Sequence, residues 1–143
     1  MSPEQTGPEG AGIPIDPFRS LPAHAQRERR ALEGAGIHDW PALADLTDQQ
    51  LAKLAVAGAA SAPTLQRLRG QAKLVVELEL EPHQAALLLH AGVPDARSLA
   101  GANPEQLWRQ TGRLQRRLTG TAVPPPDLAR VLGWIQRARR ATN

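Results

Sequence analysis

The stretch ALEGAGIHDWPALADLTDQQLAKLA, residues 31–55, has a second copy in LLLHAGVPDARSLAGANPEQLWRQT, residues 87–111. The two stretches align without a gap at a constant offset of 56 residues, and eight of their 25 positions are identical. Self-similarity at a fixed spacing indicates that one structural unit occurs twice in a chain. We therefore expect the 143 residues to form two small related units.

Both copies carry the signals that begin and end helices. A polar N-cap oxygen accepts a hydrogen bond from the first helical turn, and a glycine just past a helix permits a left-handed turn. These signals recur in pairs at the 56-residue offset: Thr47 and Asn103, Asp39 and Asp95, Gly36 and Gly92. Each unit is thus predicted to run helix, Ala-Gly-Ile/Val turn, short capped helix, and then a further capped helix.

A longer basic helix is predicted to close each unit, over about residues 63–78 and 126–140. Apolar residues recur there at three- and four-residue spacing, as on the buried stripe of a helix. The two stripes are Leu65, Leu68, Ala72 and Val75, and Leu128, Val131, Leu132, Ile135 and Ala138. No convincing alternating strand pattern is present, so the predicted fold class is all-α.

The N-terminal residues differ in composition from the rest of the chain. Residues 1–17 hold seven Pro or Gly residues and little apolar surface. Such a segment cannot offset the entropy lost on ordering. We expect a flexible, disordered tail over 1–17, with Phe18 and Leu21 docking on a first helical unit over 18–78. The second helical unit then covers 79–143.

Composition excludes several classes of function. The chain has no cysteine, which rules out a disulfide scaffold and a thiolate metal site. Its four histidines lack the spacing of metal ligands, and no Ser-His-Asp or paired-carboxylate arrangement stands out, so we expect neither a metal or cofactor nor an enzyme. No apolar run approaches the roughly 18 residues of a membrane span, and the polar N-terminus lacks a secretory layout. A cytoplasmic protein without membrane contact or a small-molecule substrate is expected.

The net charge of +3 conceals an uneven distribution. Residues 31–96 carry four basic and eight acidic side chains, whereas residues 97–143 carry nine arginines and two acidic side chains. A basic half indicates a surface for nucleic acid or for an acidic partner. A solvated helix face explains the same pattern equally well.

The candidate binding residues lie in the second unit. Four of its arginines recur at three- and four-residue spacing, so most of them share a helix face. Thr111-Gly112-Arg113-Leu114 is predicted to form a turn whose glycine lets a phosphate approach the backbone. Of the three tryptophans, all more typical of core packing than of base stacking, Trp134 is expected to be the most exposed. The candidate nucleic-acid or partner-binding residues are Arg109, Gly112, Arg113, Arg116, Arg117, Arg130, Trp134 and Arg137.

The repeated phrase Leu-x-x-Ala-Gly-Ile/Val, then a capped short helix, then cap-x-x-Gln-Leu, resembles helix-hairpin-helix-like (SAM-like) domains over about residues 21–140. It is similar to a bacterial family of unknown function built from such units in tandem, and to part of the C-terminal domain of the RNA polymerase alpha subunit. The resemblance implies two tandem units of this kind. In DNA-binding members of the class, a glycine hairpin holds the phosphate backbone.

The leading hairpins fit that phosphate-binding role poorly. Residues 32–36 match the hairpin by letter, but Glu33 would repel phosphate. The segment before the second unit has no glycine and holds three glutamates over residues 77–81. Two functions therefore remain open: a non-enzymatic module that binds the phosphate backbone of DNA or RNA through the basic second unit, or an adaptor that binds an acidic protein partner with the same helices.

Overall fold

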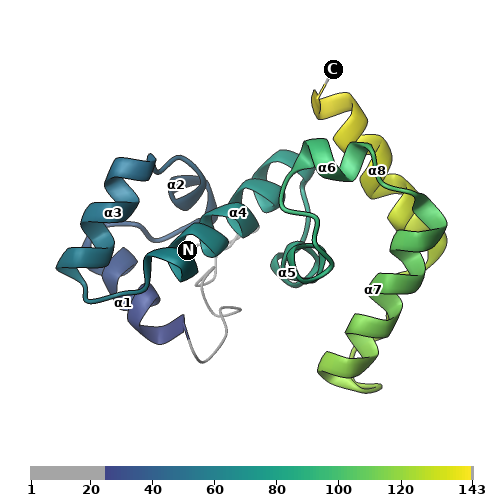
Figure 1. Cartoon of the computed structure of the whole chain (residues 1–143), viewed down its shortest axis with the longest axis horizontal. Coiled ribbons are helices and arrows are strands. Elements are labelled where there is room, and N and C mark those ends of the chain that lie inside the picture. The colour runs from purple at the N-terminus through teal and green to yellow at the C-terminus, as the bar shows by residue number, and fades with distance from the viewer. Residues whose placement is uncertain (1–24, 143) are drawn as a thin grey trace, which may run out of the picture.

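The computed structural model describes residues 25–142, which form eight helices and no strand within that range (Figure 1). The predicted all-α fold class is confirmed. The predicted tail over 1–17 and the docking of Phe18 and Leu21 lie outside the described residues. The helices are α1 Gln26–Gly34, α2 Trp40–Ala44, α3 Asp48–Ala57, α4 Ala62–Leu78, α5 Pro82–His90, α6 Ala96–Ala100, α7 Pro104–Thr119 and α8 Leu128–Thr142.

The helices fall into two sets, which we name the first repeat (α1–α4) and the second repeat (α5–α8). Under the 56-residue offset, α1 and α2 have the same boundaries as α5 and α6, and α3 begins where α7 begins. The predicted caps explain this agreement. The side chains of Thr47 and Asn103 accept hydrogen bonds from the backbone N–H groups of Gln50 and Gln106, at 3.1 and 2.9 Å. Local capping therefore sets the common helix starts.

The two Ala-Gly-Ile/Val turns end α1 and α5 in the same way. Gly36 and Gly92 both have φ of +84°, in the left-handed region that favours glycine. Beyond them, the N–H groups of Ile37 and Val93 donate to the carbonyls of Leu32 and Leu88, each at 2.9 Å. Each turn is a Schellman motif, which closes its helix and returns an aliphatic side chain to the core.

Helix α4 joins two hydrophobic cores. Leu65, Leu68 and Ala72 pack into the core of the first repeat, whereas Leu74 and Leu78 pack into that of the second. Figure 1 shows α4 between α1–α3 and the helices of the second repeat. One continuous helix thus couples the two repeats.

The second halves of the repeats differ. Helix α3 has 10 residues, whereas α7 has 16. Ser61 caps α4, and Asp127 accepts a hydrogen bond from Arg130 N–H at the start of α8. These two caps lie 66 residues apart rather than 56, so the second repeat contains ten additional residues.

The predicted stripe of α8 is correct except at one position. Val131, Ile135 and Ala138 are buried, but Leu132 is 38% exposed. Trp134 occupies the position on the core face that the stripe predicts for Leu132, because Trp134 lies three residues after Val131 and four before Ala138.

Candidate nucleic-acid interface

All four arginines of α7 are exposed, and their spacing of three and four residues places them along one side of the helix. We name this face the arginine ridge: Arg109, Arg113, Arg116 and Arg117. Only Arg109 of the ridge forms an ion pair with another described residue, at 3.6 Å from Glu105 across one helical turn, and both side chains are largely exposed. An exposed pair of this kind is weak. The ridge therefore presents its positive charge to solvent.

The predicted turn at Gly112 is wrong. Gly112 is buried in the middle of α7, and a Cβ built on it would lie 3.6 Å from Nη1 of Arg116. The 56-residue offset pairs Gly112 with Val56, which is also helical. The turn comes at Gly120 instead, with φ of +61°. Because the backbone around Gly112 is helical, its amides are not available to a phosphate, and only the arginine side chains can make that contact.

The backbone N–H groups of the two Ala-Gly turns also form hydrogen bonds within the protein. In the first turn, the N–H groups of Ala35, Gly36 and Ile37 all donate to carbonyls of α1. The second turn repeats this arrangement with the N–H groups of Ala91, Gly92 and Val93. These turns therefore serve as helix ends in this chain, and they offer no donor to a backbone phosphate.

The N-terminus of α4 carries an internal carboxylate. Glu28 is only 4% exposed, and its Oε2 accepts a hydrogen bond from Ser61 N–H at 2.9 Å. A helix N-terminus favours negative charge, and here a side chain of the same repeat supplies it. An external anion would have to displace a buried carboxylate from this position.

The candidates on α8 do not form a basic face. Trp134 is 3% exposed and lies in the core of the second repeat, so its predicted exposure is wrong. The exposed tryptophan is Trp108 on α7, at 38%. Arg137 Nη1 donates to the carbonyls of Leu78 and Glu79, at 3.0 and 3.4 Å, and so ties α8 to the end of α4.

Arg130 lies on the exposed surface beside carboxylates. It lines a shallow hollow with Glu79, Glu81 and Asp127, and Arg137 lines the same hollow. The charges of this hollow therefore largely cancel. Of the eight predicted site residues, the four of the arginine ridge form a coherent basic face, and the other four do not extend it.

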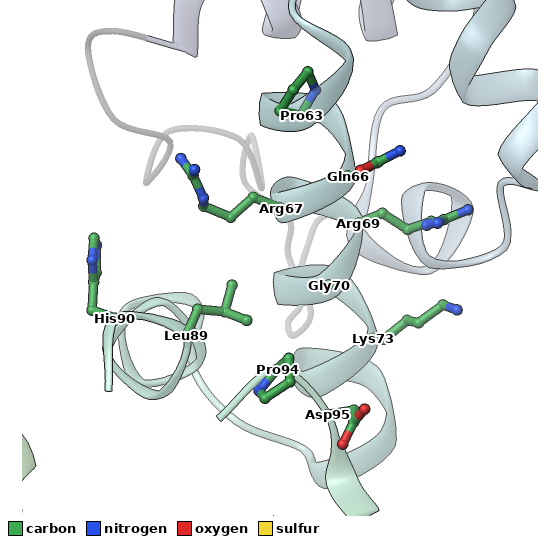
Figure 2. A pocket seen from close by; sticks show the side chains of 10 residues that line it. All are labelled: Pro63, Gln66, Arg67, Arg69, Gly70, Lys73, Leu89, His90, Pro94 and Asp95. Carbon is green, nitrogen blue, oxygen red and sulfur yellow. The ribbon is translucent and has the colours of Figure 1, made fainter. Parts of the chain in front are cut away.

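The structure also reveals a basic groove that the sequence reasoning missed. It lies between α4 and the segment around the second Ala-Gly turn, and its volume is about 790 Å³ (Figure 2). Its lining residues on α4 recur at helical spacing, a signal that a helical projection of residues 63–73 would have shown. The excess of acidic residues over 31–96 concealed them. The lining is Pro63, Gln66, Arg67, Arg69, Gly70, Lys73, Leu89, His90, Pro94 and Asp95.

Residues 25–142 contain neither a metal-binding cluster nor a membrane-spanning helix. No group of three or more His, Asp or Glu side chains in that range is placed to hold a metal ion. None of the helices in the same range is both long and apolar enough to cross a membrane.

The comparisons with known proteins give a family without a known function. The family model described as Domain of unknown function (DUF4332) matches residues 22–141 and so covers both repeats. No curated protein and no solved structure matches the chain. The chain belongs to the DUF4332 family.

Proposed function

We propose that this member of the DUF4332 family is a non-enzymatic helical module that binds the phosphate backbone of DNA or RNA through the arginine ridge of α7. One observation carries the proposal: four exposed arginines share a helix face whose only ion pair among residues 25–142 is the exposed contact of Arg109 with Glu105. Guanidinium groups bind phosphate through two parallel hydrogen bonds. Contacts to the backbone alone carry no base information, so the binding is independent of sequence.

Arginine side chains, rather than the backbone amides of a glycine hairpin, make the proposed contact with phosphate. The likeness to helix-hairpin-helix-like domains would place a phosphate on a glycine turn. In this chain the amides of both Ala-Gly turns donate to their own helices. Long arginine side chains on a helix need no free amide. A cytoplasmic location belongs to the same proposal, because the role needs a compartment that holds nucleic acid.

A protein partner is the second candidate, and a different observation favours it. Three large apolar side chains of the second repeat are exposed: Trp108 at 38%, Leu118 at 56% and Leu132 at 38%. Protein interfaces are enriched in tryptophan and arginine and depleted in lysine. An acidic partner could use the arginine ridge together with Trp108 on the same helix.

Direct binding to a labelled duplex separates the two functions. Fluorescence anisotropy at about 50 mM NaCl, where phosphate contacts are least screened, should detect binding by the wild-type chain. The variant R113Q/R116Q/R117Q should bind much more weakly. A matched control, R27Q/R30Q/K53Q, removes three exposed positive charges from the first repeat and should bind like wild type.

The proposal fails if wild-type protein shows no affinity for DNA or RNA under these conditions. A pull-down from lysate with and without nuclease then tests the second candidate. A protein that is captured after nuclease treatment, and lost with Trp108→Ala, would establish the adaptor function.

A further inference from the structure

The junction groove, lined by the α4 and α5–α6 residues given above, brings Arg67 and Lys73 of α4 together with His90 of the second repeat. Figure 2 shows Arg67 reaching from α4 toward the side where His90 lies, and Lys73 on the other side of α4. Three of the four basic residues of segment 31–96 line this groove, whereas Asp95 is the only one of the eight acidic residues of that segment that does so. A segment that is acidic on average therefore presents a basic groove.

Two charged side chains of the groove, Arg69 and Asp95, already form hydrogen bonds within the protein. Arg69 donates to the carbonyl of Leu46 at 2.9 Å and to Asp48 at 2.7 Å. Asp95 caps α6 and accepts a hydrogen bond from Ser98 N–H at 2.8 Å. Arg67, Lys73 and His90 are exposed and form no ion pair with any residue of the range 25–142. These three side chains are available to an anionic ligand.

Gly70 lies in the interior of α4 and lines the groove, and packing does not require a glycine there. A Cβ built on Gly70 would lie 3.8 Å from Leu89 Cδ2 and 3.9 Å from the carbonyl oxygen of Pro94, which are ordinary van der Waals distances. Glycine is the poorest helix former after proline. A residue that weakens the helix without relieving a clash calls for another explanation, and bare backbone lets a ligand approach closely.

The hollow beside α8 that Arg130 and Arg137 line can be compared with the junction groove in its glycine and its charge. Gly133 also has open space around it and lines that hollow. The hollow nevertheless holds three carboxylates against two arginines. Of these two hollows, the junction groove alone combines an open glycine with an excess of unpaired positive charge.

We propose that the junction groove holds a single strand of DNA or RNA, with Arg67 and Lys73 contacting its phosphates and the imidazole of His90 stacking against a base. This inference rests on the proposed function and adds to it a second site, for a single strand. A groove with cationic walls and a stacking side chain is how proteins hold single strands. A duplex is too broad for a groove between neighbouring helices, because an α-helix already fits within one groove of the duplex.

The test compares a groove variant with a control of equal charge. R67Q/K73Q removes one arginine and one lysine from the groove, and R30Q/K53Q removes the same pair of residue types from exposed positions outside it. The probe is a fluorescein-labelled oligothymidine of about 20 nucleotides, which exceeds the usual site size of one single-strand-binding fold. Anisotropy is measured across a series of salt concentrations, and thermal melts establish that each variant is folded.

The groove variant should bind the oligothymidine roughly tenfold more weakly or worse, with a salt slope about 0.7 shallower for each lost phosphate contact. The control should bind like wild type. On a duplex probe the groove variant and the control should be equal, since the ridge makes that contact. An equal loss on both probes would overturn the assignment to a single strand.

Failure of the groove is distinguishable from failure of the ridge. If R113Q/R116Q/R117Q loses affinity and R67Q/K73Q binds like its control, the groove inference is overturned and the proposed function stands. If wild type binds neither probe, both are overturned. Gly70→Gln offers a second readout, with a melting temperature at or above that of wild type and weaker binding. Wild-type affinity in that variant would overturn the close approach of the strand to α4.

Discussion

The first and second repeats share the same beginning and differ in how they end. Under one offset, α1 and α2 match α5 and α6 residue for residue in their boundaries. The third helix then runs for 10 residues in the first repeat and 16 in the second. Two arginines of the ridge, Arg116 and Arg117, lie in this extension. The first two helices of each repeat therefore form the common framework, and the extension of α7 gives the second repeat a different surface.

A contact between small residues explains why the chain reverses earlier in the first repeat. A Cβ built on Gly58, at the end of α3, would lie only 2.5 Å from Ala31 Cβ on α1. The chain can therefore turn back against α1 at that point. The equivalent residues of the second repeat are Leu87 and Leu114, and two leucines cannot occupy the space of an alanine and a glycine. Helix α7 continues instead.

The largest expected effect tests whether both repeats depend equally on their cores. Leu32 and Leu88 are equivalent, and both are fully buried. Replacing either by alanine removes buried methyl groups and leaves a cavity, which should lower the free energy of unfolding by about 2–5 kcal/mol. Denaturant titration of Leu32→Ala and Leu88→Ala measures this loss. A loss below about 1 kcal/mol at one site only would show that the repeats are not equivalent in packing.

The Ala-Gly turns should also respond in parallel. Gly36→Val and Gly92→Val place a β-branched residue at φ of +84°, where no neighbouring atom lies within 4 Å of the new Cβ. Backbone strain alone should therefore cost about 1–3 kcal/mol at each site. Gly101→Val is the control, because Gly101 has φ of −93°. Melting temperatures of both turn variants near that of the control would contradict the assignment of strain to these turns.

The close approach at Gly58 should distinguish the repeats. Gly58→Ala forces a methyl group against Ala31, and overpacking of this kind costs about 1–3 kcal/mol. Gly70→Ala meets no atom closer than 3.8 Å and should be stabilising by up to about 1 kcal/mol, through helix propensity. Thermal unfolding of the two variants gives the comparison. Equal stabilisation by both would remove the explanation offered for the shorter α3.

The smallest paired effect is expected at the caps. Asp39 Oδ1 accepts a hydrogen bond from Ala42 N–H at 2.9 Å, and Asp95 Oδ1 accepts one from Ser98 N–H at 2.8 Å. Loss of such a cap costs about 1 kcal/mol, so Asp39→Ala and Asp95→Ala should be destabilised alike in denaturant titrations. A clear difference between the two would indicate that only one repeat depends on its cap.

The cap at Asp95 also predicts a dependence on pH. Hydrogen bonds from the backbone and side chain of Ser98, with the charge of Arg97, hold the pKa of Asp95 below its usual range. A carboxyl with a lowered folded pKa contributes stability above its unfolded pKa and loses it as pH falls through the folded value. The stability difference between wild type and Asp95→Asn should therefore shrink below about pH 4. A difference that persists at lower pH would contradict the cap's ionic contribution.

The helix starts were predictable because their causes are local. Thr47, Asn103 and the two cap aspartates act on amides within three residues, and Gly36 and Gly92 act on their own backbone. These signals are written in short stretches of sequence. Because equivalent residues lie 56 positions apart, each signal found in one repeat also predicts a helix boundary in the other.

The wrong predictions concern residues whose conformation or burial depends on tertiary packing. Gly112 resembles a turn in isolation, yet it lies in a helix that is packed between α5 and α8. Which of Trp108 and Trp134 is buried depends on the face that α7 and α8 turn toward the core. The helical spacing of the lining residues on α4 was a readable signal, but the junction groove itself could not be predicted, because it needs residues 63–73 and 89–95 to lie side by side.

The salt dependence of duplex binding tests the central claim, that the arginine ridge holds the phosphate backbone, most directly. The logarithm of affinity should fall linearly with the logarithm of salt for wild type. R113Q/R116Q/R117Q should lower that slope by about 0.9 for each lost contact, up to three contacts, while R27Q/R30Q/K53Q leaves it unchanged. The free energy of unfolding should barely change, since exposed arginines contribute little to stability. A ridge variant with the wild-type slope, or a wild-type protein that does not bind, would contradict the claim.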